Sequence, residues 1–225
     1  MSQPLTQIVS QRTISEVIQV RNLTKSTYVI RFERNNMAFR PGQYIVVNPE
    51  GMKQKREYSI YSSVNEPFLE LLIKEVDAGL LSRKLKQTQK GNLLELEGPF
   101  GYFVINEDQI PNKKFLFIAT GTGISPFHSI VNSYPQLNYT ILHGVRTWEE
   151  GYEKEQYLPG KYIQCTSKDQ KGDFHGRVTD YLKLHPVDTD TVVYLCGNSA
   201  MIDEAYTILE SQHLSSFQIH TEVYF

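Results

Sequence analysis

The residues best suited to chemistry lie in a few short segments of this 225-residue sequence. The first contains Arg56, Glu57, Tyr58 and Ser59 at the start of an apparent strand. Arginine can pair with a phosphate through two parallel hydrogen bonds, and tyrosine can stack on a flat aromatic ring. Because alternate residues of a strand share a face, Arg56 and Tyr58 are expected to address one ligand. Taken alone, the pattern is more typical of an exposed arginine beside a core tyrosine.

A second segment runs from Gly79 to Ser82 and is expected to open a helix. Ser82 can cap that helix, and the unpaired N–H groups at its N-terminus would favour a phosphate. By itself, the segment is better explained as an ordinary helix cap.

A third segment, residues 120–126, follows an apolar strand and leads into a helix. Its glycines, Gly121 and Gly123, would let the backbone approach a pyrophosphate closely. The third glycine of the full dinucleotide fingerprint is absent. The order strand, loop, helix is nevertheless the context that such a site requires.

Two further segments end strands near the C-terminus. Cys196 closes an apolar strand, and ligands of open α/β sheets bind beyond the carboxyl ends of strands. A lone cysteine there is more often a small buried residue. Tyr224 and Phe225 end the chain, and because terminal residues fray unless docked, they are expected to pack on a flat surface or in the core.

The elements that must position these residues differ between the two halves of the chain. Residues 27–33 alternate Tyr28, Ile30 and Phe32 with other side chains, which predicts a strand with one buried face. Together with the turns that separate the runs, this pattern indicates an antiparallel barrel. Its expected strands are 14–22, 27–33, 42–48, 56–63, 68–76 and 92–98, with one helix over 79–87.

The second half alternates short apolar strands with helical segments. The strands are expected over 114–120, 139–145, 161–167 and 191–197. A helix follows the last of them, with Ser199 as its cap and with Ile202, Ala205 and Leu209 on one face. This alternation predicts a parallel sheet covered on both faces. The domains are therefore expected to be residues 1–106 and 107–225.

The composition of the chain excludes several classes of function. The net charge of −2 argues against nucleic-acid binding, and the 40% apolar content is that of a globular protein. The two cysteines are too few for a plant-type iron–sulfur cluster, and no metal site is expected. No apolar run is long enough for a signal peptide or a membrane span. We therefore expect a cytoplasmic protein that binds no membrane.

Taken in order, the motifs resemble the ferredoxin–NADP reductase superfamily, and its short bacterial ferredoxin/flavodoxin–NADP reductases in particular. The motifs are REYS, GLLS, EGPFGYF, ATGTGISPF, HGVRT, CGNSAM and the terminal EVYF. The resemblance covers nearly the whole chain. It implies a six-stranded FAD-binding barrel followed by a Rossmann-like nicotinamide-binding domain. It also implies a monomer that transfers hydride between NADPH and bound FAD, with FAD expected rather than FMN, and passes single electrons to a ferredoxin or flavodoxin.

The resemblance also implies site residues for the flavin. Arg56 would bind the flavin phosphates, Tyr58 would flank the isoalloxazine and Ser59 would face its N5, while Ser82 and the backbone near Gly79 would hold the pyrophosphate. The implied flavin contacts are Arg56, Glu57, Tyr58, Ser59, Ile73, Lys74, Gly79, Leu80, Leu81, Ser82, Thr122, Tyr224 and Phe225.

For catalysis and the nicotinamide nucleotide, the resemblance points to the second half of the chain. Besides Ser59, the implied catalytic residues are Cys196 near the nicotinamide C4, Glu222 as a proton relay, and Tyr224 as a movable cover of the flavin. Phe225 would reach the FAD adenine. The implied nucleotide contacts are Gly121, Thr122, Gly123, Arg146, Ser167, Lys168, Arg177, Cys196, Gly197, Asn198 and Met201.

The choice of nucleotide depends on cations that could meet the 2′-phosphate of NADPH. Ser167 and Lys168 stand where related NADP enzymes often carry Ser-Arg; Arg177 follows them, and Arg146 lies at the end of the preceding strand. Lysine lacks the bidentate geometry of arginine, and NADH-dependent relatives also carry Gly-Arg-Val at this point. The pattern favours NADPH over NADH.

Three alternatives remain open. The chain could be the NADH-dependent reductase component of an oxygenase, although it lacks the thiolates for a cluster of its own. It could reduce free flavin, or it could be a flavin- or nucleotide-binding sensor module without turnover. An acidic electron partner would dock on a basic rim, for which Lys53, Lys55, Arg83 and Lys84 are candidates.

Overall fold

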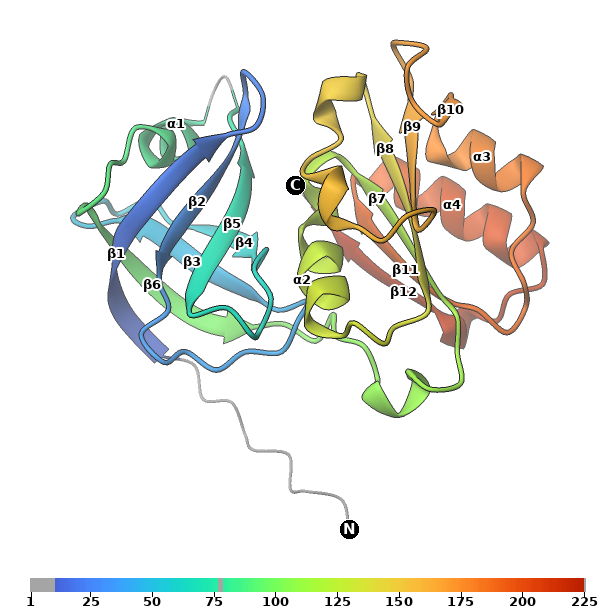
Figure 1. Ribbon diagram of the computed structural model, residues 1–225, viewed down its shortest axis with the longest axis horizontal. Helices are drawn as coiled ribbons and strands as arrows, with labels where there is room; N and C mark the ends of the chain where they lie inside the picture. The colour runs from blue at the N-terminus through green and yellow to red at the C-terminus, as the bar shows by residue number, and fades with distance from the viewer. Residues whose placement is uncertain (1–10, 77–78, 225) are drawn as a thin grey trace. The chain divides into compact units, whose positions relative to one another are not determined.

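The structure is a computed structural model that describes residues 11–76 and 79–224. It divides into two compact units, residues 1–104 and 105–225 (Figure 1). Within the described ranges, no helix has the length and apolar character needed to cross a bilayer. The same ranges contain no cluster of His, Cys, Asp and Glu suited to a metal ion.

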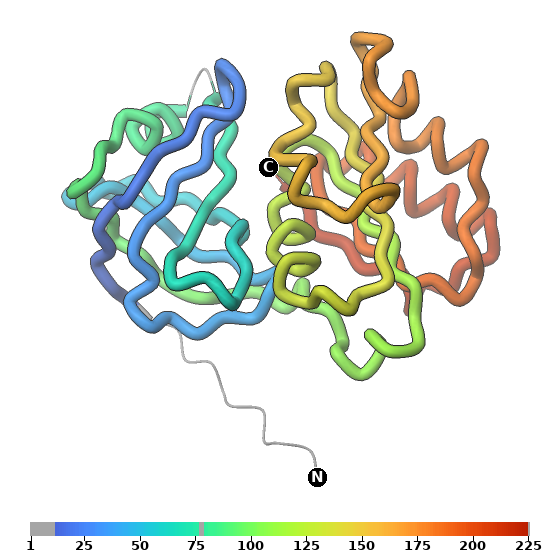
Figure 2. Tube along the Cα trace, viewed as in Figure 1, coloured from blue at the N-terminus to red at the C-terminus, as the bar shows by residue number. Residues whose placement is uncertain are grey.

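The first unit is a nearly closed barrel. Its six antiparallel strands lie in the order β4-β3-β6-β1-β2-β5. Tyr61, just after β4, donates its N–H to the Glu70 carbonyl in β5 at 2.8 Å, which links the two ends of the sheet. The trace curves round accordingly (Figure 2). The elements are β1 (Gln11–Asn22), β2 (Thr27–Glu33), β3 (Tyr44–Pro49), β4 (Arg56–Ser59), β5 (Phe68–Lys74), α1 (Leu80–Lys86) and β6 (Leu93–Phe100).

The barrel core contains the predicted face of β2. Tyr28, Ile30 and Phe32 are fully buried. The expectation of a single buried face is wrong at Val29, which is also fully buried. Its partners in the neighbouring strands are Arg21 and Leu72, so larger side chains flank it on both sides.

The second unit is a parallel sheet with helices on both faces. Its order is β10-β9-β8-β7-β11-β12. Figure 1 shows α2 on one face, and α3 and α4 on the other. The elements are η1 (Glu107–Gln109), β7 (Phe115–Thr120), η2 (Gly121–Ile124), α2 (Ser125–Ser133), β8 (Tyr139–Val145), η3 (Trp148–Glu150), η4 (Lys154–Gln156), β9 (Tyr162–Thr166), β10 (Phe174–His175), α3 (Val178–Leu184), β11 (Val192–Gly197), α4 (Ser199–Ser211), η5 (Ser216–Gln218) and β12 (Ile219–Val223). Both predicted architectures, the antiparallel barrel and the parallel sheet, are confirmed.

Helix α4 packs as its sequence predicts, but it is capped one residue earlier. Ile202, Ala205 and Leu209 are buried. The cap is Asn198, whose side-chain oxygen accepts the Met201 N–H at 2.9 Å. Asn198 has an extended backbone, whereas Ser199 is already helical and so cannot be the N-cap.

Candidate functional site

The segment with the arginine and tyrosine forms the edge strand β4 of the barrel. Arg56 and Glu57 are exposed, Tyr58 is half-buried against the core, and Ser59 is buried. Burial raises the pKa of Tyr58 to about 12, and the nearby Arg56 guanidinium opposes that rise. The two side chains therefore lie close together, as the strand alternation predicts. Arg56 makes no ion pair within the part of the chain that the structure describes.

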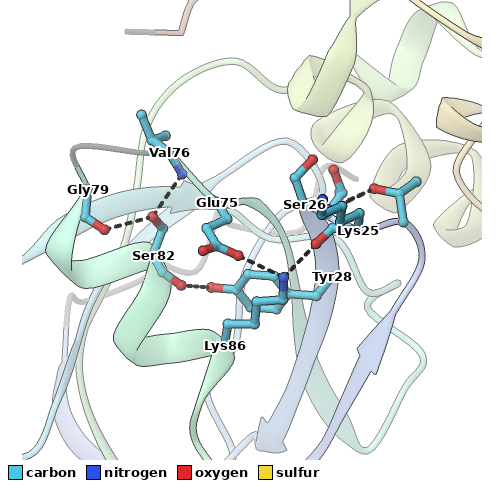
Figure 3. A network of polar contacts seen from close by, with 10 residues as sticks. Lys25, Ser26, Tyr28, Glu75, Val76, Gly79, Ser82 and Lys86 are labelled. Atoms are coloured by element: carbon cyan, nitrogen blue, oxygen red, sulfur yellow. Dashed lines mark hydrogen bonds and ion pairs between the residues drawn. The ribbon is translucent and has the colours of Figure 1, made fainter.

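The expectation that Ser82 caps α1 is wrong. The N-cap is Gly79, which has an extended backbone, and Ser82 lies inside the first turn. Its hydroxyl accepts the Val76 N–H at 3.2 Å and donates to the Gly79 carbonyl at 3.3 Å (Figure 3). Ser82 therefore ties Val76, which lies just after β5, to the start of the helix.

Tyr28 connects β2 to that turn, and sequence reasoning treated it only as a core residue. Its hydroxyl donates to the Ser82 carbonyl at 2.5 Å (Figure 3). Burial raises the pKa of Tyr28, with further contributions from Tyr58 and Glu75. Tyr28 thus lies between the two predicted flavin segments of the barrel. A buried tyrosine needs a partner for its hydroxyl, which is the signal that could have singled it out.

The other predicted flavin contacts of this unit surround the same turn. Ile73 is buried and pairs with Tyr28 across the sheet, while Lys74 is half-buried at the end of β5. Leu80 is exposed and Leu81 is buried in the barrel core. The strand end and the first turn of α1 therefore form one local cluster.

In the second unit, the turn after β7 packs directly against the end of β11. A Cβ on Gly123 would lie 2.5 Å from the Cys196 carbonyl oxygen, so the close approach requires glycine. Gly197 has a φ of +148°, and a Cβ there would lie 2.1 Å from the Thr120 hydroxyl. That hydroxyl accepts both the backbone N–H and the side-chain amide of Asn198, at 3.3 and 3.1 Å. Thr120 is the first residue of the predicted segment 120–126, but its residue type alone gave it no role in the site.

Two other predicted nucleotide contacts have mainly local partners. Thr122 is half-buried, and its carbonyl accepts the Ser125 hydroxyl at 2.8 Å. Met201 is 7% exposed and belongs to the core of the second unit.

The structure brings Cys196, Glu222 and Tyr224 together at the carboxyl end of β11. Cys196 pairs with Glu222 in the register of β11 and β12, and the Tyr224 N–H donates to the Gly197 carbonyl at 2.8 Å. Burial raises the pKa of the Cys196 thiol and Glu222 adds to the rise, whereas a hydrogen bond with the Tyr224 side chain opposes it. The thiol is therefore neutral. Phe225, also predicted here, lies outside the described residues.

The predicted phosphate-binding cations lie at the carboxyl ends of β8, β9 and β10. Arg146, Ser167, Lys168 and Arg177 are all exposed, and the Lys168 N–H donates to the Arg146 carbonyl at 2.9 Å. Over the described ranges, none of these three cations forms an ion pair, in contrast to Lys183. This edge of the sheet therefore presents exposed cations, although the carboxylates of Glu150 and Asp180 accept the backbone N–H groups of Arg146 and Arg177 at 2.8 and 2.9 Å.

Two family models match the chain. An oxidoreductase FAD-binding domain covers residues 11–105, and an oxidoreductase NAD-binding domain covers residues 117–206. They correspond to the barrel and to most of the parallel-sheet unit.

Individual proteins show the same likeness. The flavodoxin/ferredoxin–NADP reductase of Buchnera aphidicola is 30% identical, over 87% of this chain and 89% of that protein. The toluate 1,2-dioxygenase electron transfer component of Pseudomonas putida is 27% identical, over 92% of this chain and 66% of that protein. A Neisseria gonorrhoeae ferredoxin–NADP+ reductase, solved with FAD and NADP, shares the fold with a TM-score of 0.83 at 20% identity, over 95% of this chain and 99% of that one.

The chain thus spans most of the length of the first relative but only about two thirds of the second. The two domain models match this chain in the order of a flavin domain followed by a nucleotide domain. The chain belongs to the ferredoxin–NADP reductase family of FAD- and NAD-binding oxidoreductases.

Proposed function

We propose that this oxidoreductase transfers hydride from NADPH to bound FAD and passes electrons singly to a ferredoxin or flavodoxin. The observation that carries the proposal is the assembly of Gly123, Cys196, Glu222 and Tyr224 at one edge of the parallel sheet. It combines a backbone turn without side-chain bulk, a neutral thiol, a carboxylate and an aromatic ring, which suits a flat nicotinamide nucleotide.

The barrel residues fit a flavin dinucleotide. Arg56 is exposed and makes no ion pair in the described part of the chain, so its guanidinium can hold a phosphate. Tyr58 offers an aromatic face, and Ser59, the next residue of the strand, carries a hydroxyl. Bound FAD would supply the redox chemistry by accepting two electrons as hydride and releasing them one at a time. Holding and orienting that group is the task of these residues.

The residues of the second unit would orient the nucleotide. A neutral Cys196 can approach the nicotinamide ring without adding charge, and Glu222 would order the site and relay protons. Tyr224 would cover the flavin until the nicotinamide displaces it. Arg146, Lys168 and Arg177 would select NADPH, because exposed side-chain cations that form no ion pair among the described residues suit its additional phosphate.

The partner would be a small acidic carrier that docks on a basic rim. Lys53, Arg83 and Lys84 are exposed on the barrel. Lys55 adds less positive charge to this rim than the sequence suggests, since it forms an ion pair with Glu97. Complementary charge would steer the encounter and make its rate sensitive to salt.

A second candidate is the reductase component of an oxygenase. Its support is the likeness to the electron transfer component of toluate 1,2-dioxygenase and to the phenol hydroxylase P5 protein of Acinetobacter pittii, which is 29% identical over 92% of this chain. In that role the same site would take NADH, and a separate iron–sulfur protein would receive the electrons.

The test is anaerobic reduction of the purified protein, followed through its visible flavin absorbance. Faster bleaching by NADPH than by NADH, with electrons then passed to ferredoxin or flavodoxin, is the expected result. Preference for NADH would favour the oxygenase component, and flavin that dissociates on dilution would indicate a free-flavin reductase. A protein that binds FAD but is reduced by neither nucleotide would be a binding module, and the proposal would be wrong.

A further inference from the structure

His143 is a fully buried histidine whose two ring nitrogens both have hydrogen-bond partners. Its Nε2 lies 2.8 Å from the Gly121 carbonyl oxygen, and its Nδ1 lies 2.8 Å from the Tyr162 hydroxyl. A carbonyl can only accept, so Nε2 carries the hydrogen and donates it. Nδ1 is then left to accept from the Tyr162 O–H. The two contacts select one neutral tautomer.

The surroundings of the pair keep it in that state. Burial lowers the pKa of His143 to about 4, although the bond to Gly121 and the charge of Glu150 oppose the shift. The Tyr162 ring is stacked on Tyr157, with 5.0 Å between ring centroids and 1° between the planes. The Tyr162 hydroxyl therefore has a fixed direction toward the imidazole.

The carbonyl that His143 holds belongs to the first residue of the turn η2. An ideal Cβ on Gly121 would meet no heavy atom within 4 Å, so packing does not hold the turn on that side. The residues on either side are anchored differently, Thr120 by Asn198 and Gly123 against Cys196. The bond from His143 supplies an anchor between those two points.

We propose that His143 and Tyr162 are positioning residues for the nicotinamide nucleotide. They act through the Gly121 carbonyl and hold the turn in the conformation that receives the nucleotide, without touching the nucleotide themselves. The inference rests on the proposed function, because it takes this turn as the nucleotide site. In the sequence His143 stands out only as part of the HGVRT motif, which gives it no role.

Two stacked tyrosines provide a matched test. Tyr162→Phe removes the hydroxyl that bonds to His143, whereas Tyr157→Phe removes a buried hydroxyl that has no hydrogen-bond partner in the described part of the chain. With FAD-loaded protein, calorimetric titration with NADP+ should show about 5- to 10-fold weaker binding for Tyr162→Phe, the usual effect of one lost hydrogen bond. The KM for NADPH should rise in parallel while kcat and FAD content stay near wild type. Tyr157→Phe should bind NADP+ as wild type does.

A second pair of variants tests the donor itself and remains usable if Tyr162→Phe fails to fold. The amide of His143→Gln can still donate to the Gly121 carbonyl, whereas His143→Leu cannot. NADP+ should therefore bind more tightly to the glutamine variant than to the leucine variant.

Equal NADP+ affinity in wild type and Tyr162→Phe, or equal affinity in the two His143 variants, would overturn the positioning role alone. Wild-type protein that binds FAD but no nicotinamide nucleotide would overturn the proposed function as well, and with it this inference.

Discussion

The Tyr28 hydroxyl donates a 2.5 Å hydrogen bond to the Ser82 carbonyl, across 54 positions of the sequence. The bond joins the core strand β2 to the first turn of α1, where the proposed flavin site has its pyrophosphate end. Tyr58, from the other flavin segment, lies near enough to raise the pKa of Tyr28. One buried hydroxyl therefore connects the two segments.

Tyr28→Phe should weaken FAD binding about 5- to 10-fold, because the Ser82 carbonyl loses its buried donor and α1 is held less firmly. The dissociation constant can be measured by the quenching of FAD fluorescence during reconstitution of the apoprotein. Tyr139→Phe is the control, since it removes a hydroxyl that accepts the Leu158 N–H in the other unit. Equal losses in both variants would show that the Tyr28 bond has no special connection to the flavin.

Selection of NADPH can be tested at the exposed cations. Replacing Lys168 and Arg177 with alanine should raise the KM for NADPH about 10- to 100-fold, given the usual strength of hydrogen bonds between charged groups. The KM for NADH should hardly change, because NADH lacks the 2′-phosphate. Lys183→Ala is the control, as Lys183 is ion-paired with Glu204. Parallel increases for both nucleotides would argue against a phosphate site at these residues.

The close packing of the turn against β11 predicts different costs for two neighbouring glycines. Gly123→Ala would place its Cβ 2.5 Å from the Cys196 carbonyl oxygen, and because backbone must move, about 1–3 kcal/mol of stability should be lost. A Cβ on Gly121 would meet no heavy atom within 4 Å, so Gly121→Ala should cost only the left-handed backbone strain of about 1–2 kcal/mol, at most that of Gly123→Ala. Thermal unfolding measures both, and a Tm order with Gly121→Ala below Gly123→Ala would contradict this packing.

The periodic features of the fold could be predicted from the sequence, because they depend on neighbouring residues. The alternation of apolar residues over 27–33 predicts β2, and the continuous apolar run over 192–197 predicts β11. The first residues of the helices were harder to predict than the strands. Ser82 and Ser199 are good capping residues, but both already lie within their helices, so Gly79 and Asn198 are the caps.

Some residues of the candidate site could likewise be predicted from the sequence, and others could not. Glycines and cations near strand ends can be recognised from residue types, since parallel strands bring their carboxyl ends to one edge. The contacts of Tyr28, Thr120, His143 and Tyr162 cannot, because their partners are set by the pairing of distant strands. The residues that neighbour a histidine in an apolar strand do not indicate which atoms its two ring nitrogens will bind.

The buried His143 predicts a pH dependence of stability. Its pKa is lowered from 6.5 to about 4, so between these values only the unfolded chain takes up the proton. The free energy of unfolding should therefore fall with decreasing pH across this window, by about 3 kcal/mol for this group at its lower end. The slope should be shallower in His143→Gln, as measured by urea unfolding. His213→Asn, which removes an exposed imidazole, should keep the wild-type slope; equal slopes in all three proteins would contradict the assignment.

The proposed role of Tyr224 can be tested with two variants that distinguish the effect of its ring from that of its hydroxyl. If Tyr224 covers the flavin until nicotinamide displaces it, Tyr224→Ala removes a competitor. NADP+ should then bind more tightly, and turnover should slow because the product leaves more slowly. Tyr224→Phe keeps the ring but loses the bond to Cys196, so its NADP+ affinity should stay near wild type. Binding of oxidised and reduced nucleotide, followed by calorimetry and stopped-flow, measures both effects. Unchanged affinity in Tyr224→Ala would show that the ring does not compete with the nicotinamide, and tighter binding in both variants would assign the effect to the hydroxyl instead.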